Sequence, residues 1–399
     1  MSSKHTDDHS EPYIQQFSVP FQYPVYFTHG LFDPNNPILE TVVARNHATN
    51  PHRVLVYIDD GVIAAVPDIE ERITNYLAHC PDYFKLVRPP ESVPGGERTK
   101  NGWNVVQNIM ARIGSSHLCR HSFVIAVGGG SALDMIGFAT SLVHRGVRLI
   151  RVPTTVLAQN DAGVGVKNGM DEHGMKNFVG TFAPPYAVLN DSHFLQTLDD
   201  KYWLGGLSEA YKVAIIKDRP LLDYLAENAR ALRRRDMAPM EHVIRRAAIL
   251  HLEHIAGSGD PFEFGTARPL DFGHWCAHRL EVQSNYALGH GQAVAIGIAL
   301  DTYYAGRIGL LTQDECDLIL TAMCDTGLPI WSQVLEHQDE NGEPEILRGL
   351  TEFQEHLGGR LTITLPNHLG DKTEIHEMDA RIIQDAVIYL ADYRKANHT

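Results

Sequence analysis

The chain passes from strand to helix in Phe123-Val124-Ile125-Ala126-Val127-Gly128-Gly129-Gly130-Ser131, and this stretch decides its fold. The five apolar residues predict a buried strand, and residues 132–143 predict a helix after the glycines. Glycines at such a turn let backbone N–H groups approach a pyrophosphate at the helix N-terminus. Alone, the turn fits a tight loop equally well, so the neighbouring strands must decide between the two interpretations.

Three further apolar runs predict strands at 53–58, 148–153 and 186–191, with helical segments such as 67–79 between them. This alternation is typical of a parallel, doubly wound, Rossmann-like α/β sheet. After about residue 192 the pattern predicts amphipathic helices and one late strand at 360–365. The predicted helices cover 201–216, 220–235, 240–255, 272–283, 291–307, 312–326 and 379–394. We therefore expect a disordered tail at 1–16, a dinucleotide-binding α/β domain at 17–191 and a mostly helical domain at 192–399.

The composition is that of a soluble globular protein, with 399 residues, 44% of them hydrophobic, and a formal net charge of −15. No basic cluster stands out, so we expect no nucleic-acid partner. No run of 18 apolar residues occurs, so we expect no membrane span. The five cysteines include no Cys-x-x-Cys pair, which is typical of reduced thiols and predicts a cytoplasmic location.

Polar residues follow several of the predicted strands. Asp59 ends the first strand, where its carboxylate can accept hydrogen bonds from ribose hydroxyls, and two threonines follow the 148–153 strand. The polar turn at 94–100 is of the kind that closes over a ribose. Because these groups lie at consecutive strand ends, together they favour a dinucleotide over separate solvated loops. The predicted cofactor residues are Asp59, Glu97, Lys100, Gly129, Gly130, Asp134, Thr154 and Thr155.

Two distant parts of the chain each carry part of a metal site. Glu209 follows a glycine pair, whereas His274 and His290 stand in Phe-Gly-His and Gly-His-Gly contexts. One carboxylate and two imidazoles leave a coordination position open, which is typical of a catalytic zinc. The same ligands suit cobalt or iron. The chain has 22 histidines, so the prediction depends on these neighbours more than on the residue type.

The glycine-rich segment 160–178 carries Asp161, Lys167, Lys176 and Asn177. A charged segment is usually a solvated surface, but the glycines indicate backbone folded closely around a ligand. Lysine and asparagine beside Arg145 can bind a phosphate through charge, amide and guanidinium.

Two side chains share a helix face with predicted metal ligands. Lys212 lies one helical turn after Glu209, and His278 lies one turn after His274. Both are expected to face the metal region without binding the ion.

These residues together resemble the sugar phosphate cyclase superfamily, whose best-known member is 3-dehydroquinate synthase. The most specific part is Val-Pro-Thr-Thr-Val-Leu-Ala-Gln-Asn-Asp at 152–161, followed by the lysines and the Glu/His/His spacing. The similarity runs from about Asp59 to His356. It implies an NAD-binding α/β domain, a helical domain, an active site between them and a homodimer.

The resemblance also implies roles for individual residues. A divalent metal, expected to be zinc with cobalt as the alternative, would be bound by Glu209, His274 and His290. Catalytic positions would be Asp161, Lys167, Lys176, Asn177, Lys212, Glu263, Asp271 and His278. The substrate phosphate would contact Arg145, across a dimer interface, and Lys167, Asn177 and His356. NAD would contact Asp59, Glu97, Lys100, Gly129, Gly130, Asp134, Thr154, Thr155, Lys167, Lys176 and Thr197.

Four positions depart from the dehydroquinate synthase pattern. Asp271 replaces an asparagine, His251 and His356 replace lysines, and Ala267 stands where an arginine meets the substrate carboxylate, with Arg268 one position along. The changes at His251, His356 and Ala267 remove or move positive charge, and Asp271 adds a negative one, which favours a substrate without a carboxylate.

The segments around Asp271 and His356 are similar to the sedoheptulose 7-phosphate cyclases, which make valiolone-type C7 cyclitols. His278 is typically a proline in 2-epi-5-epi-valiolone synthases, so its presence favours the 2-epi-valiolone branch. The implied reaction is transient oxidation, phosphate elimination, reduction and intramolecular aldol cyclisation.

Three alternatives stay open. One is 3-dehydroquinate synthase itself, and the second is a metal-dependent alcohol or glycerol dehydrogenase, against which the Lys176-Asn177 phosphate cluster stands. The third is a protein that binds NAD and metal without catalysis.

Overall fold

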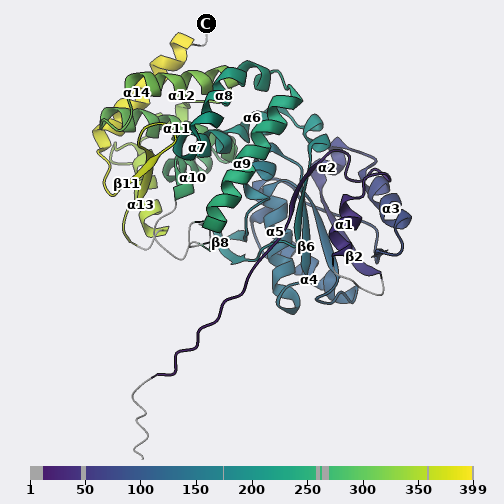
Figure 1. The fold of residues 1–399 in the computed structure, drawn as a ribbon. Coiled ribbons are helices and arrows are strands. Elements are labelled where there is room, and N and C mark those ends of the chain that lie inside the picture. Colours follow the sequence, from purple (N-terminus) through teal and green to yellow (C-terminus); the bar gives the residue numbers. More distant parts are fainter. Residues whose placement is uncertain are drawn as a thin grey trace, which may run out of the picture.

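A seven-stranded parallel sheet lies at the centre of the N-terminal half (Figure 1). The computed structural model describes residues 12–45, 51–173, 175–257, 261–262, 269–356 and 359–397. The strand order is β1-β9-β6-β5-β2-β3, and β4 also pairs with β2. The strands are β1 (Val25–Thr28), β2 (His52–Asp59), β3 (Phe84–Leu86), β4 (Glu91–Val93), β5 (Phe123–Gly128), β6 (Arg148–Pro153) and β9 (Ala187–Asp191).

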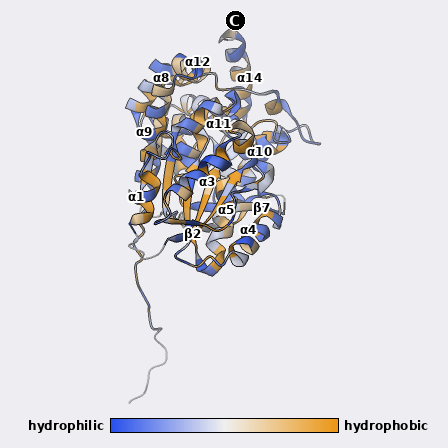
Figure 2. Ribbon diagram, turned by 90° about the vertical axis from the view of Figure 1, so that its right-hand side faces the viewer, coloured by the Kyte–Doolittle hydropathy of each residue, from blue (hydrophilic) through white to orange (hydrophobic). Residues whose placement is uncertain are grey.

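Helices cover both faces of this sheet, so the predicted doubly wound α/β fold is confirmed. Phe123, Ile125 and Val127 of β5 pack into one apolar cluster, whereas Val124 and Ala126 pack into the cluster on the opposite face. The apolar strands lie between amphipathic helices in Figure 2. The helices are α1 (Ile38–Ala44), α2 (Asp60–Ala65), α3 (Ile69–His79), α4 (Asn104–Ser115) and α5 (Gly130–Leu142).

The C-terminal half is mostly helical, also as predicted, and is built around one large apolar cluster. The segment predicted as a single helix at 201–216 is two helices, because the chain bends at Gly205-Gly206. The late strand pairs in an antiparallel hairpin, β10 (Ile363–Pro366) with β11 (Lys372–Ile375). The helices are α6 (Asp200–Gly205), α7 (Leu207–Lys217), α8 (Arg219–Arg233), α9 (Met237–Gly257), α10 (His274–Gln283), α11 (His290–Arg307), α12 (Gln313–Thr326), α13 (Arg348–His356) and α14 (Ala380–Asn397).

A second antiparallel hairpin, β7 (Lys167–Glu172) with β8 (Met175–Phe182), was not predicted. The glycines of this stretch had indicated backbone folded closely around a ligand. The hairpin packs against α5 and supplies Lys176 to the site described below.

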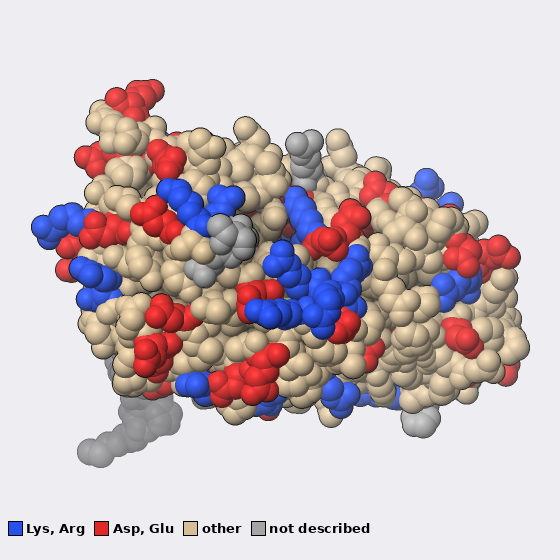
Figure 3. Space-filling model, turned by 90° about the horizontal axis from the view of Figure 1, so that it is seen from above, with Lys and Arg blue, Asp and Glu red and all other residues tan. Residues whose placement is uncertain are grey.

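The N-terminal segment before β1 is irregular, and the surface carries mixed charges. Residues 12–24 have no regular structure, and the rest of the predicted tail lies outside the described residues. None of the described helices is both long and apolar enough to cross a membrane. On the face seen in Figure 3, acidic side chains border a group of basic ones, and surface pairs such as Arg235–Asp200 at 3.3 Å reduce the net field.

Arg151 on β6 organises the loop that follows the sheet. It is fully buried, and its guanidinium donates to the carbonyl oxygens of Gly163, Gly165 and Lys167 at 2.8–3.1 Å and to Asn168 Oδ1 at 2.6 Å. Burial lowers the pKa of Arg151, because removal from water disfavours the charged guanidinium. The arginine thereby fixes the backbone between Asp161 and Lys167.

We predict that Arg151→Met lowers the free energy of unfolding by about 3–5 kcal/mol, because it leaves buried acceptors without a donor. Chemical denaturation followed by circular dichroism measures this. The control Arg234→Met removes an exposed arginine 3.7 Å from Asp236 and should change stability by less than about 0.5 kcal/mol. Equal stability of both variants would contradict the role given to Arg151.

Candidate active site

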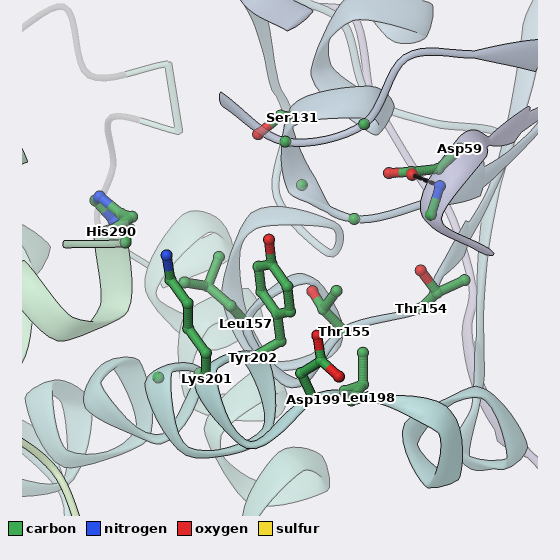
Figure 4. A pocket seen from close by; sticks show the side chains of 18 of the residues that line it. Asp59, Ser131, Thr154, Thr155, Leu157, Leu198, Asp199, Lys201, Tyr202 and His290 are labelled. Atoms are coloured by element: carbon green, nitrogen blue, oxygen red, sulfur yellow. Dashed lines mark hydrogen bonds between the residues drawn. The ribbon is translucent and has the colours of Figure 1, made fainter. Parts of the chain in front are cut away.

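A cavity of about 920 Å³ lies between the sheet and the helical half. The ends of β2, β5 and β6 form one wall, and α6 and the start of α11 form the other (Figure 4). Many predicted cofactor residues line it, and this agreement supports the nucleotide prediction. They are Asp59, Glu97, Gly129, Gly130, Thr154, Thr155 and Thr197.

Glycines enclose the carboxylate of Asp59 at the cavity wall. A Cβ atom on Gly95 would lie 2.2 Å from Asp59 Oδ1, and a Cβ on Gly128 would lie 2.9 Å from Asp59 Cβ. Asp59 Oδ1 accepts from the backbone N–H of Gly61 at 2.8 Å, and burial raises the pKa of Asp59. The fixed carboxylate is well placed to accept hydrogen bonds from ligand hydroxyls.

Lys100, Asp134, Lys167 and Lys176 do not line this cavity, although all four were predicted to contact the cofactor. Lys100 Nζ lies 2.6 Å from Asp134 Oδ2 and donates to Asn177 Oδ1 at 2.9 Å. Burial alone would lower the pKa of Lys100, but Asp134 and Glu97 raise it. The contacts of Lys100 with Asp134 and Asn177 therefore join α5 to the β7–β8 hairpin.

The predicted metal ligands do meet. Glu209 on α7, His274 at the start of α10 and His290 at the start of α11 offer ligand atoms within 4.8 Å of one another. Glu209 Oε1 lies 3.7 Å from His274 Nε2 and 3.4 Å from His290 Nε2. Three elements far apart in the sequence thus converge on one point.

Each imidazole is oriented through its other nitrogen. His274 Nδ1 lies 3.0 Å from the carbonyl oxygen of Phe272, and His290 Nδ1 lies 3.0 Å from Glu281 Oε1. Both rings therefore present Nε2 to Glu209, as metal-binding histidines commonly do. Glu281 was not among the predicted site residues, although its spacing from His274 and His278 places all three on one face of α10.

Two close backbone contacts make this convergence possible. A Cβ on Gly291 would lie 2.0 Å from the carbonyl oxygen of Gly205, which brings the start of α11 against the α6–α7 corner. A Cβ on Gly297 would lie 1.9 Å from the carbonyl oxygen of Gly273, whose φ of +78° favours glycine. Larger residues would push the histidines away from Glu209.

The donor set fits a divalent cation. Among the described residues, no donor forms a well-aligned hydrogen bond to either buried carboxylate oxygen of Glu209, although Lys212 Nζ lies 2.5 Å from Oε2. Two nitrogens and one oxygen suit zinc, with a position left for substrate or water. A second group, His278, Glu281 and His290, also lies close together, but both oxygens of Glu281 already have partners, Lys176 at 2.5 Å and His290 Nδ1 at 3.0 Å. In the first group a lysine occupies only Oε2 of Glu209, and Oε1 faces Nε2 of both imidazoles. The first group is therefore the better metal site.

The pKa shifts of the metal group, Glu209, His274 and His290, and of the adjacent His278 favour binding of a cation. Burial would raise the pKa of Glu209, but Lys212 lowers it to about 2. Burial would lower the pKa of His290, but Glu281 and Glu209 raise it to about 10, so a proton fills part of the role of a metal ion. Burial lowers the pKa of His278 to about 3, which leaves that imidazole neutral at pH 7.

Asp161 and Lys212 continue the cluster toward the sheet. Lys212 Nζ lies 3.5 Å from Asp161 Oδ1, and His251 Nδ1 lies 2.9 Å from the same oxygen. Burial would raise the pKa of Asp161, but Lys212 and His251 hold it well below its usual value. Asp161 is thus an anion shared between a lysine and an imidazole.

The other predicted site residues have only long-range contacts with the metal group, are exposed, or lie outside the described residues. Asp271 interacts electrostatically with Lys212 and His274, and Lys167 begins β7 with an exposed side chain. Arg145 is exposed beyond the far end of α5, about 20 Å of helix from the glycine turn, so it does not join the cluster of its own chain. Glu263, with Ala267 and Arg268, and the side chain of His356 lie outside the described residues.

Two family models and several relatives match most of this chain. The 3-dehydroquinate synthase N-terminal family model matches residues 91–204, and the 3-dehydroquinate synthase C-terminal model matches 206–343. The 2-epi-5-epi-valiolone synthase of Streptomyces glaucescens is 32% identical over 377 residues, covering 93% of this chain and 92% of the relative. The 3-dehydroquinate synthase of Pseudomonas putida is 31% identical over 373 residues, covering 93% and 95%.

Superposition on a solved structure supports the same family. The 2-epi-5-epi-valiolone synthase from Streptomyces hygroscopicus subsp. jinggangensis, with NAD+ and Zn2+ bound, superposes with a TM-score of 0.84 at 28% identity, covering 96% of this chain and 100% of that one. The site and these matches define a sugar phosphate cyclase. The chain belongs to the 3-dehydroquinate synthase family, and the predicted superfamily is confirmed.

We predict that Glu209→Gln and His274→Ala each weaken Zn2+ binding by more than about 100-fold, because each removes a ligand. Competition with a chromogenic chelator measures the affinity. His278→Ala is the matched control, since it removes an adjacent imidazole that is not a ligand in the first group. Loss of the ion from the control, with retention by Glu209→Gln, would place the metal at the second group instead.

Asp301 supports the start of α10, and its pKa makes the stability of the fold depend on pH. This fully buried carboxylate accepts from the backbone N–H of Gly273 at 3.0 Å and from Trp275 Nε1 at 2.7 Å, yet burial raises its pKa to about 7. Between about pH 4 and 7 the folded state holds a proton that the unfolded state has lost. This carboxyl group therefore makes unfolding easier as pH rises through that window.

We predict that Asp301→Asn flattens the fall in unfolding free energy across this window by up to about 1.4 kcal/mol per pH unit. Urea unfolding of the metal-free protein between about pH 4 and pH 8 measures the slope. The same slope in the variant and the wild type would show that Asp301 is ionised throughout.

Proposed function

We propose that this protein is a metal- and NAD-dependent cyclase that converts sedoheptulose 7-phosphate into 2-epi-valiolone. The related enzyme that superposes on it carries NAD+ and Zn2+. In this chain the 920 Å³ cavity supports the nucleotide and the group Glu209, His274 and His290 supports the metal.

One observation carries the choice of substrate. His251 lies 2.9 Å from Asp161, so an imidazole bound to a carboxylate stands where the dehydroquinate synthase pattern has a lysine. Of the lysines described in this cluster, Lys176 and Lys212 lie against carboxylates as well. A site whose cations are already paired favours a substrate with hydroxyls in place of a carboxylate.

We assign oxyanion stabilisation, proton transfer and substrate orientation to different residues of the site. When bound, the metal would polarise substrate hydroxyls, and NAD would accept and return a hydride. Lys212 and Lys176 would stabilise developing oxyanions, and the neutral imidazole of His278 would relay a proton. Asp161 would orient Lys212, and Asp271 would accept from a substrate hydroxyl. Because His278 is retained, we favour 2-epi-valiolone over its 5-epimer.

The phosphate would be bound by Lys167, Asn177 and His356, with Arg145 supplied by a second copy of the chain. Arg145 is exposed and distant from its own site, which is the arrangement that a homodimer with shared sites requires. A solution mass of two chains would agree with this proposal.

We predict that the purified chain with NAD and Zn2+ releases inorganic phosphate from sedoheptulose 7-phosphate. NMR should show a C7 cyclitol, and absorbance should show no net accumulation of NADH, because the hydride is returned. The carboxylated heptulosonate phosphate should release at least about tenfold less phosphate, since Lys176 and Lys212, among the described residues of the cluster, are already paired with carboxylates.

Each competing function has its own outcome. Turnover of the carboxylated sugar alone would identify a 3-dehydroquinate synthase. NADH accumulation with a simple polyol would identify a dehydrogenase. Binding of NAD and metal without phosphate release from either sugar would identify a binding protein.

A further inference from the structure

A continuous chain of polar contacts links the glycine turn to the metal group. Ser131 Oγ donates to Glu97 Oε1 at 2.5 Å, and Glu97 Oε2 lies 3.2 Å from Lys176 Nζ. Lys176 Nζ lies 2.5 Å from Glu281 Oε2, and Glu281 Oε1 lies 3.0 Å from His290 Nδ1. The chain begins at the N-terminus of α5 and ends on a predicted metal ligand.

This polar chain crosses between the two halves of the protein. Ser131, Glu97 and Lys176 belong to the sheet half, whereas Glu281 and His290 belong to the helical half. The side chain of Glu281 is fully buried and that of Lys176 is 12% exposed. The contact between the two side chains is thus largely shielded from water, so we expect a shift at one end to be passed to the other.

We propose that Glu281 is a positioning residue that couples dinucleotide binding to metal binding. The proposal rests on the proposed function, because it takes NAD and a divalent cation as the two ligands. Glu281 acts through His290 and is not itself a metal ligand.

The physical reason lies in how Glu281 is held. Its Oε1 lies 3.0 Å from Nδ1 of His290, which turns Nε2 toward Glu209 and the predicted metal position. Its Oε2 is fixed by Lys176, which Glu97 fixes in turn, and Glu97 and Ser131 line the nucleotide cavity. A ligand that orders either end reduces the entropy that the other ligand must remove, so each should strengthen the other.

The test measures the Zn2+ dissociation constant of the metal-free chain with and without saturating NAD, by chelator competition. In the wild type NAD should tighten Zn2+ binding at least about fivefold. Glu281→Gln keeps the volume but removes the charge that Lys176 requires, so the ratio should fall to within about twofold of one. A residue with only a structural role would weaken binding equally in both conditions and leave the ratio unchanged.

The matched control is Glu345→Gln. Glu345 forms an ion pair with Arg279 of the same helix, α10, away from the metal group, so this variant should keep the wild-type ratio. A wild-type ratio near one, or a wild-type ratio in Glu281→Gln, would overturn the coupling while leaving the proposed function intact. Failure of the wild type to bind either ligand would overturn both.

Discussion

The buried carboxylate of Glu209 is the constraint on which the rest of the site depends. Its side chain is 2% exposed, and burial of an unpaired charge costs several kcal/mol. Lys212 and two imidazoles surround it, so α7, α10 and α11 must meet at one point. A divalent cation at that point would compensate the charge more completely than a protonated histidine does.

Small residues allow the elements to meet. Gly206, Gly273, Gly291 and Gly297 lie so close to neighbouring atoms that a Cβ would prevent the contact. The glycines of the nucleotide turn act in the same way around Asp59. The two halves of the active site are therefore shaped by close backbone approach, and the charged side chains are then fixed by mutual pairing. This explains why few charges in the cluster remain available for a charged substrate group.

The fold could be predicted where local patterns are strong. The apolar run of β5 and its glycine turn indicated the sheet, and Glu209, His274 and His290 were identifiable from their neighbours. The β7–β8 hairpin was missed because its glycines and charges match a loop, and only pairing between strands makes it regular. Glu281 was missed because its position on the same helix face as His274 and His278 does not show that Lys176, distant in the sequence, pairs with it. The same applies to the pairing of Lys100 with Asp134, which the sequence assigned to the cofactor.

The central claim is that Glu209, His274 and His290 bind one ion at the wall of the nucleotide cavity. An anomalous difference map from Zn2+-loaded crystals, recorded at the zinc absorption edge, tests it most directly. The account predicts a single strong peak bonded to Glu209 and to Nε2 of both histidines. A peak between His278, Glu281 and His290, or density bonded to only one of the three proposed ligands, would contradict it.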